Sequence, residues 1–285
     1  MKSKLIMGDN PFFGINHRSG EKAAEYSKIK SDFSIAASVL EEASRHGIHN
    51  LMVTTHSELP QLLKVAKARL DDAGLRKPKL SLGVPYAHKL NSVVADKGLL
   101  GLVTLIKPYK LILAGVRDFL ALVFKNRKFP KHIFSEFISS ELRSISDYEI
   151  EYVCFQNLVT DMILGLDRTN LFEHITGSLS STGAKPVFIT MNPIELDKLL
   201  PEHVPICFHY NINGFMVQPS LEQVQKFIST TKRPIWAMGV MASGAIESDK
   251  VWSDPYLKKF DRILYATSKP ERIKALVDKI EEVKI

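Results

Sequence analysis

The sequence has 285 residues, of which 45% are hydrophobic and 24% are charged. Such a chain can bury one large core and is typical of an ordinary globular protein. Its formal net charge of +7 favours anionic ligands, but no Lys/Arg cluster interleaved with aromatic residues is present, which makes nucleic acid a disfavoured partner. No long uncharged apolar run predicts a transmembrane helix, and the N-terminal apolar stretch is too short for a signal peptide.

Both cysteines, Cys154 and Cys207, lie inside apolar runs. We interpret them as buried small hydrophobic side chains, because no CxxC pair or disulfide framework accompanies them. A chain of this kind suits a reducing compartment, so we expect a cytoplasmic location.

Apolar runs alternate with helical patterns along the chain. The first helical pattern spans residues 31–47, where Phe33, Ala36 and Leu40 recur at helical spacing and Gly47 can end the helix. The apolar runs are nearly continuous in hydrophobicity, as expected of strands that are buried on both faces. The eight predicted strands cover residues 4–7, 50–55, 79–85, 152–157, 186–192, 205–211, 233–240 and 260–268.

Eight parallel strands, most of them followed by a helix, are the pattern of the (β/α)8 barrel, also called the TIM barrel. We therefore predict one barrel domain over residues 1–285. The alternative is a doubly wound open sheet, which is disfavoured because no GxGxxG motif follows the first predicted strand.

The connection between the third and fourth predicted strands, residues 88–147, is far longer than a barrel loop needs to be. Its apolar residues are dense between positions 99 and 134, and Pro108 divides this stretch into two helical pieces. We interpret residues 88–147 as a helical insertion that packs on the barrel or on a second subunit. The alternatives are a lid over the active site and a peripheral helix on acidic lipid.

In a (β/α)8 barrel the loops after the strands build the active site, so polar residues at the strand ends are candidates. The candidate general acids and bases are Asp9, His56, Tyr86 and His209. The candidate substrate-binding residues are Asn10, His17, Thr54, Gln156, Asn157, Asn192, Tyr210 and Asn211.

Each of these assignments has a plainer alternative. Asp9 can cap a turn through backbone N–H groups, and a single histidine is more often a structural residue than a ligand. A metal held by His17, His56, His209 and Asp9 is disfavoured, because no HxH or HExxH spacing is present.

An anion site is predicted after the seventh and eighth strands, where this fold usually binds phosphate. Glycines there allow close backbone approach, hydroxyl groups can donate hydrogen bonds, and cations add positive charge. The alternative is a well-capped helix. The predicted cofactor-binding residues are Gly239, Ser243, Gly244, Thr267, Ser268, Lys269 and Arg272.

The segments "PIWAMGVMASGAI" and "DRILYATSKPERI" resemble the C-terminal third of aldo-keto-reductase-like barrels, and "MGDNPFFG" resembles the glycine-rich first loop of that group. The resemblance implies that the turn at Ser268, Lys269 and Arg272 receives the phosphate of NADP. It also implies a catalytic Asp, Tyr, Lys and His near strands two to four. The corresponding segments here read "TTHSELP", "GVPYAH" and "FQN", so the chain is similar to a branch that lacks the usual tetrad, with Tyr86 or His56 as a substitute acid.

Three hypotheses follow. The first is an aldo-keto-reductase-like enzyme that binds NADP or another phosphate-bearing ligand and uses a non-standard acid. The second is a lyase, isomerase or metal-assisted hydrolase that acts on a small phosphorylated or polyhydroxylated substrate through Asp9, His56 and His209. The third is a non-catalytic barrel that binds a ligand, or a partner such as a second subunit, through residues 99–134.

Overall fold

A computed structural model describes residues 4–13, 33–85, 131–143, 145, 148–167, 169–179 and 182–282. Within these ranges, eight strands form one closed barrel in the order β1 to β8, and every neighbouring pair is parallel. The predicted (β/α)8 barrel is thereby confirmed. The strands are β1 (Leu5–Gly8), β2 (Asn50–Thr54), β3 (Lys79–Val84), β4 (Ile150–Phe155), β5 (Lys185–Thr190), β6 (Ile206–His209), β7 (Ile235–Met238) and β8 (Arg262–Tyr265).

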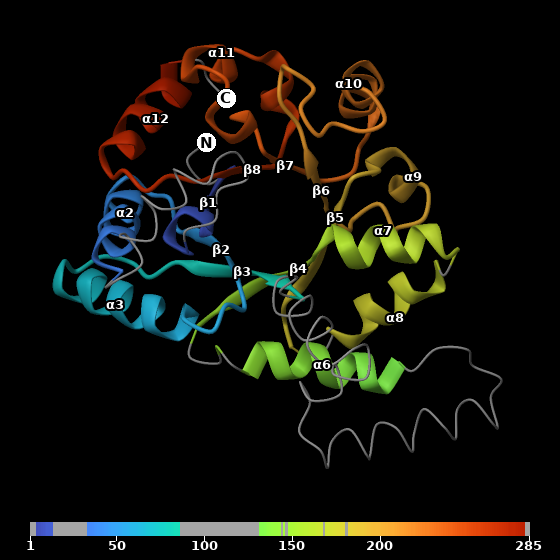
Figure 1. The fold of residues 1–285 in the computed structure, drawn as a ribbon, viewed down its shortest axis with the longest axis horizontal. Coiled ribbons are helices and arrows are strands. Elements are labelled where there is room, and N and C mark those ends of the chain that lie inside the picture. Colours follow the sequence, from blue (N-terminus) through green and yellow to red (C-terminus); the bar gives the residue numbers. More distant parts are fainter. Residues whose placement is uncertain are drawn as a thin grey trace.

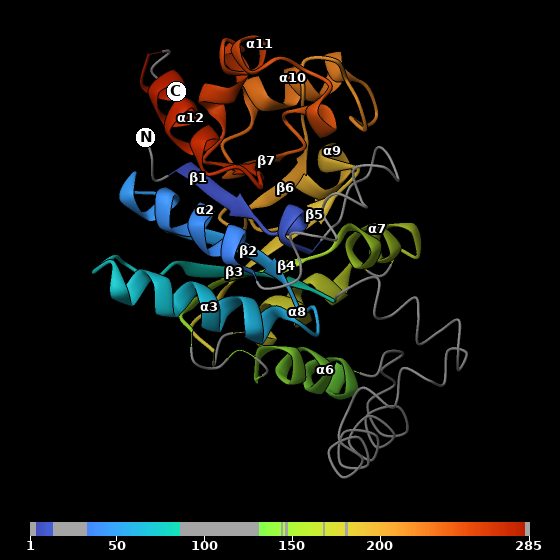
Figure 2. The same ribbon diagram turned by 60° about the vertical axis from the view of Figure 1, so that its left-hand side comes forward.

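Helices surround the strands as an outer ring (Figures 1 and 2). The α-helices are α2 (Ser34–Arg45), α3 (Leu59–Asp72), α6 (Lys131–Arg143), α7 (Asn157–Gly165), α8 (Asn170–Ser178), α9 (Pro193–Asp197), α10 (Leu221–Thr230), α11 (Ser248–Trp252) and α12 (Glu271–Glu282). The 3-10 helices are η2 (Asn10–Phe13), η4 (Ala242–Gly244) and η5 (Pro255–Lys259). No helix in the described ranges has the length and apolar character needed to cross a bilayer.

Two hydrophobic clusters form the core. The larger one fills the layer between the strands and the helices, and the smaller one fills the inside of the barrel. The barrel interior is therefore packed rather than open, as is usual for this fold. Both cysteines are free and buried inside it, as their apolar surroundings predict. The inner cluster consists of Ile6, Met52, Cys154, Val187, Ile189, Cys207 and Trp236.

Of the predicted insertion at residues 88–147, the structure describes α6 and Ile145. Helix α6 contacts β3 and α8, where the side chain of Ile138 is buried. Residues 99–130 lie outside the described residues, so a subunit interface, a lid or a lipid-binding helix at this place stays a prediction.

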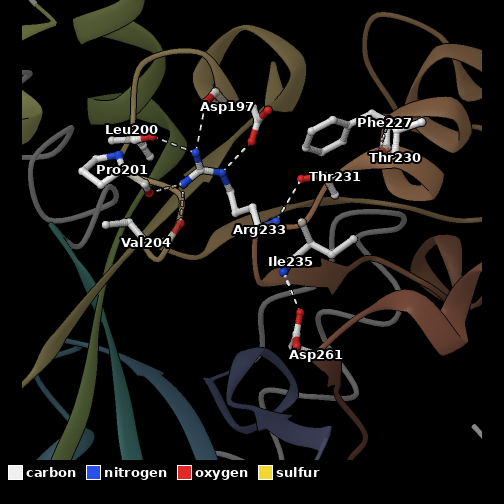
Figure 3. A network of polar contacts seen from close by, with 10 residues as sticks. All are labelled: Asp197, Leu200, Pro201, Val204, Phe227, Thr230, Thr231, Arg233, Ile235 and Asp261. Carbon is white, nitrogen blue, oxygen red and sulfur yellow. Dashed lines mark hydrogen bonds and ion pairs between the residues drawn. The ribbon is translucent and has the colours of Figure 1, made fainter.

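At the amino end of β7, a buried arginine ties several segments together (Figure 3). Arg233 Nε donates to Asp197 Oδ1 at 2.6 Å, and its two terminal nitrogens donate to the carbonyl oxygens of Asp197, Leu200, Pro201 and Val204 at 2.6 to 3.0 Å. All five bonds end on α9 or on the segment that leads into β6. Arg233 therefore fixes the amino ends of β6 and β7 relative to α9.

Candidate functional site

The side chains of a strand point alternately to the two faces, so the inner cluster identifies which residues face the barrel axis. Gly8 follows the inward-facing Ile6 by two positions, and Thr54 follows the inward-facing Met52 by two positions. Both lie at the carboxyl ends of their strands, β1 and β2. The same alternation places eight positions, one from each strand, at the inner carboxyl edge. They are Gly8, Thr54, Gly83, Gln156, Met191, His209, Met238 and Ala266.

Asp9 follows β1 and binds the end of β2. Its Oδ2 accepts hydrogen bonds from the Thr54 backbone N–H at 2.8 Å and from the Thr54 hydroxyl at 3.3 Å. The side chain is buried, and burial raises the pKa of Asp9 to about 6, although the hydrogen bonds from Thr54 act in the opposite direction. A carboxyl group with this pKa exchanges a proton readily near neutral pH.

A glycine on β3 brings two polar side chains together. A Cβ at Gly83 would lie 2.9 Å from Gln156 Nε2 and 3.2 Å from the Thr54 methyl carbon. Thr54 and Gln156 thus approach each other across a strand that has no side chain at this point. The Thr54 hydroxyl is bonded to Asp9, while its methyl group faces Gln156 across Gly83, so the three side chains lie in sequence along the ends of β1 to β4.

His209 and Gly239 are in contact at the opposite side of the mouth. His209 ends β6, and Gly239 follows β7 with a left-handed backbone at φ +70°. A Cβ at Gly239 would lie 2.5 Å from His209 Nδ1, so the imidazole ring occupies the space above this glycine. The absence of a side chain at Gly239 allows the observed position of the His209 ring.

His56 lies after β2, against the first loop. Its ring stacks on Phe13 with centroids 4.5 Å apart and an interplanar angle of 17°. Its Nδ1 lies 3.2 Å from the backbone nitrogen of Glu58, which donates a hydrogen bond to it, and 3.3 Å from Glu58 Oε2. These contacts fix the orientation of the imidazole beside the Asp9 loop.

A strained turn follows β7. Ala242, Ser243 and Gly244 have left-handed φ values of 45°, 57° and 82° in succession. For residues with a Cβ this conformation costs about 1–2 kcal/mol each, and such strain is frequent at ligand sites. The Met241 carbonyl accepts backbone hydrogen bonds from Gly244 and Ala245 and thereby closes the turn. Ser243 is exposed at its tip.

The neighbouring turn after β8 leads into α12. Thr267 is buried, and its hydroxyl accepts a hydrogen bond from the Lys269 backbone N–H at 3.1 Å. Ser268 is half-buried, while the side chains of Lys269 and Arg272 are exposed. Arg272 also lies close enough to Tyr265 to oppose the rise that burial causes in the pKa of that phenol. The predicted hydroxyl and cationic groups therefore lie on one turn.

Other predicted substrate-binding residues do not face the mouth in this way. Tyr210 is fully buried, and its hydroxyl donates to Asp254 Oδ2 at 2.8 Å. Asn211 is also buried, and its amide binds the backbone N–H and carbonyl of Phe215 at 2.9 and 2.8 Å. The alternation that points His209 inward points Tyr210 outward. Asn211 also donates to the Gly239 carbonyl at 3.3 Å and so ties the β6–α10 connection to the turn after β7.

The remaining predicted residues vary in position. Asn10 begins η2 and Asn157 begins α7, and both are half-buried. Asn192 precedes α9, with an exposed side chain that makes no capping hydrogen bond. His17 and Tyr86 lie outside the described residues.

Two residues that shape the candidate site, Gly83 and Asp161, were not predicted from the sequence. Gly83 lies inside a predicted strand, where a glycine often marks close approach of other groups, so the sequence carried a signal for it. Asp161 of α7 accepts hydrogen bonds from the Thr190 hydroxyl at 2.5 Å and from the Met191 N–H at 3.0 Å, and so fixes the carboxyl end of β5. No local pattern distinguishes Asp161 from other helical carboxylates. In the described ranges, no group of three or more His, Cys, Asp or Glu side chains is arranged to hold a metal ion.

Comparison with solved structures agrees with this fold. Two structures from Pseudomonas aeruginosa, each described as a "putative aldo-keto reductase", match 99% of this chain with TM-scores of 0.56 and 0.57. The matches cover 91% and 90% of those chains at 14% and 13% sequence identity. The chain thus has a (β/α)8 barrel fold similar to that of these two structures. At this level of sequence identity, the similarity concerns the fold alone. No protein-family model and no curated protein sequence matches the chain.

Proposed function

We propose that this barrel is an oxidoreductase that reduces a small carbonyl compound with NADP(H) and uses a non-standard acid. The observation that carries the proposal is the buried carboxyl group of Asp9, with a pKa near 6, which is hydrogen-bonded to Thr54 at the barrel mouth. The aldo-keto-reductase-like fold supports the reaction class, and the turns after β7 and β8 support the cofactor.

The residues present fit a phosphate-bearing dinucleotide. Ser243 and Gly244 form an exposed, strained turn, and no atom outside the immediate chain lies within 4 Å of a Cβ built on Gly244. Ser268, Lys269 and Arg272 supply a hydroxyl group and two positive charges on the next turn. These groups would hold the phosphates of NADP(H). When bound, the nicotinamide supplies hydride to a carbonyl carbon.

Reduction of a carbonyl also requires a proton at its oxygen. Asp9 is suited to provide it, because a carboxyl group with a pKa of about 6 is partly protonated near neutral pH. The Thr54 hydroxyl is hydrogen-bonded to this carboxyl group, while Gln156 and His209 can orient the substrate oxygen by hydrogen bonds. Asp9 then recovers its proton from solvent. His56, beside the same loop, is the second candidate acid, and Tyr86 the third.

Cofactor binding can be tested by thermal shift. Millimolar NADPH should stabilise the native state by RT ln(1 + [L]/Kd), about 2.7 kcal/mol at about 100 times Kd. The double variant Lys269→Ala, Arg272→Ala should lose most of that shift. Lys274→Ala, an exposed lysine on the same helix, is the matched control and should retain it. Absence of any shift, or a full shift in the double variant, would contradict the proposed cofactor site.

The acid can be tested by NADPH consumption with a panel of aldehydes and ketones. Asp9→Asn should lower kcat by about 100-fold or more, the usual contribution of a positioned acid, without a change in the NADPH thermal shift. His56→Ala and His209→Ala in the same assay separate the acid from groups that only orient substrate. An unchanged kcat in Asp9→Asn would remove Asp9 from the mechanism.

Asp9 also supports a second candidate function. The same buried carboxyl group could act as a general base in a lyase or isomerase that acts on a phosphorylated or polyhydroxylated substrate. In that case a sugar phosphate, rather than NADPH, should produce the shift that depends on Lys269 and Arg272.

A further inference from the structure

The amino ends of the strands, opposite the candidate active site, surround a cavity of about 820 Å3. Its lining comes from the starts of β4 to β8, from the residue before β1, and from the end of α8 and the loops that precede β5 and β6. This volume is within the range of small-molecule sites, about 300–1,000 Å3. The packed interior of the barrel separates it from the mouth at the carboxyl ends.

Two aromatic rings form the inner end of the cavity. Tyr152 of β4 and Trp236 of β7 meet edge to face, with ring centroids 4.8 Å apart and an interplanar angle of 81°. Trp236 is 2% exposed. Neither its indole N–H nor the Tyr152 hydroxyl makes a hydrogen bond with another described residue. The two rings therefore form an apolar corner at the inner end of the cavity, and this corner carries two unused hydrogen-bond donors.

Three cationic side chains line the cavity, and two of them lie beside these rings. Lys185 pairs with Tyr152 in the register of β4 and β5, and its Nζ lies 5.9 Å from the centroid of the tyrosine ring. Arg262 pairs with Trp236 in the register of β7 and β8. By strand alternation both residues lie on the barrel's inner face, because Val187 and Leu264, two residues further on, pack in the inner cluster.

The third cation, Lys4, lines the cavity from before β1, and its Nζ donates to the Lys258 carbonyl at 3.1 Å. Among the described lining residues, Asp261 is the one carboxylate, and its Oδ2 already accepts a hydrogen bond from the Ile235 N–H at 2.9 Å. No described carboxylate forms an ion pair with Lys4 or Lys185. The balance of charge in the cavity is positive, which favours an anionic ligand.

We propose that this cavity is a second ligand site, which binds a small organic anion with a planar apolar body. The planar body would lie in the corner between Tyr152 and Trp236, and the anionic group would be held by Lys185 with Arg262 and Lys4. The proposal does not rest on the proposed function, because it uses no residue of the carboxyl-end site.

The test uses the fluorescence of Trp236 in the full-length chain. The sequence has two tryptophans, and Trp252→Phe leaves Trp236 alone without breaking a hydrogen bond, since the Trp252 indole N–H has no partner in the described residues. Benzoate and phenyl phosphate should each change the fluorescence saturably. Benzyl alcohol, which lacks the charge, and inorganic phosphate, which lacks the planar body, should bind at least about tenfold more weakly, as expected for the loss of one charge-assisted contact.

Lys185→Met retains side-chain length and removes the charge, so it should weaken benzoate binding by about tenfold or more. Lys226→Met, on the exposed face of α10, is the matched control and should leave benzoate affinity unchanged. The proposal is overturned if the Trp236 signal does not saturate with millimolar benzoate, or if the two lysine variants behave alike. Equal affinity for benzoate and benzyl alcohol in the unsubstituted chain would also overturn it, without any reliance on a lysine variant.

Discussion

At the scale of single residues, the pKa of Asp9 links the candidate mechanism to stability. Burial raises the pKa of this carboxyl group from its ordinary value of 3.8 to about 6. The folded state therefore holds the proton more tightly than the unfolded state. The stability that this proton contributes is fully present below pH 3.8 and is lost as the pH rises through about 6.

Asp9→Asn should abolish this dependence on pH. As the pH increases from below 3.8 to above about 6, the unfolding free energy of the variant should rise relative to that of the wild type. The rise should be about 3 kcal/mol, because two pKa units correspond to about that energy. Urea unfolding at several pH values measures it, with Asp72→Asn at the exposed end of α3 as control. If the difference in unfolding free energy between variant and wild type stays constant across this pH range, burial does not raise the pKa of Asp9.

The contact between Gly239 and His209 gives a second prediction at this scale. Gly239 and Gly244 both have left-handed backbones, so an alanine at either position should cost about 1 kcal/mol. At Gly239 the new Cβ would also strike His209 Nδ1, whereas at Gly244 it would meet no atom within 4 Å. Gly239→Ala alone should therefore shift the imidazole resonances of His209 in an NMR spectrum. Similar shifts in both variants would indicate that the turn, rather than this contact, positions the ring.

At the scale of elements, Arg233 joins α9 to the starts of β6 and β7. A lysine at this position can replace only part of its five hydrogen bonds, and buried carbonyl groups would lose their donors. Arg233→Lys should lower the unfolding free energy by about 3 kcal/mol or more. Urea unfolding measures this, and Lys232→Ala on the exposed neighbouring position should have little effect. A loss below about 1 kcal/mol would mean that water replaces the guanidinium group.

Elements were the features that the sequence predicted best. Buried parallel strands are nearly continuous apolar runs, so all eight were located, and all of their ends agree with the structure to within three residues. The candidate site was harder to predict because a strand end contains both inward and outward residues. His209 and Tyr210 are neighbours with opposite directions, and alternation counted from Cys207 would have separated them. The contact from Asp161 to Thr190 depends on the packing of α7 and carries no local pattern.

At the scale of the whole molecule, the first and last strands close the barrel by direct pairing of β1 with β8. Helix α12 runs back from the carboxyl end of β8 and packs on α2, so both ends of the described chain lie at the amino ends of the strands. Chains with neighbouring termini usually tolerate circular permutation.

A permutant that joins residue 285 to residue 1 and opens the chain between Arg76 and Lys77 should fold with one cooperative transition. Its Tm should stay within about 5 °C of the wild-type value, because the new ends lie in an exposed loop. A permutant opened within β6, between Cys207 and Phe208, should not fold. Calorimetry compares the two. Separate transitions in the first permutant would contradict a single domain over residues 1–285.

Gly8 and Ala266, at the inner carboxyl edge, have a consequence for how such a barrel can diverge. A Cβ at Gly8 would lie 3.3 Å from the Cβ of Ala266, so the two positions share one small space between β1 and β8. A larger side chain can enter this space from one strand or the other, but not from both. Substitutions at these positions should be epistatic: in descendants of this sequence, whichever position enlarges first restricts the other to a small residue.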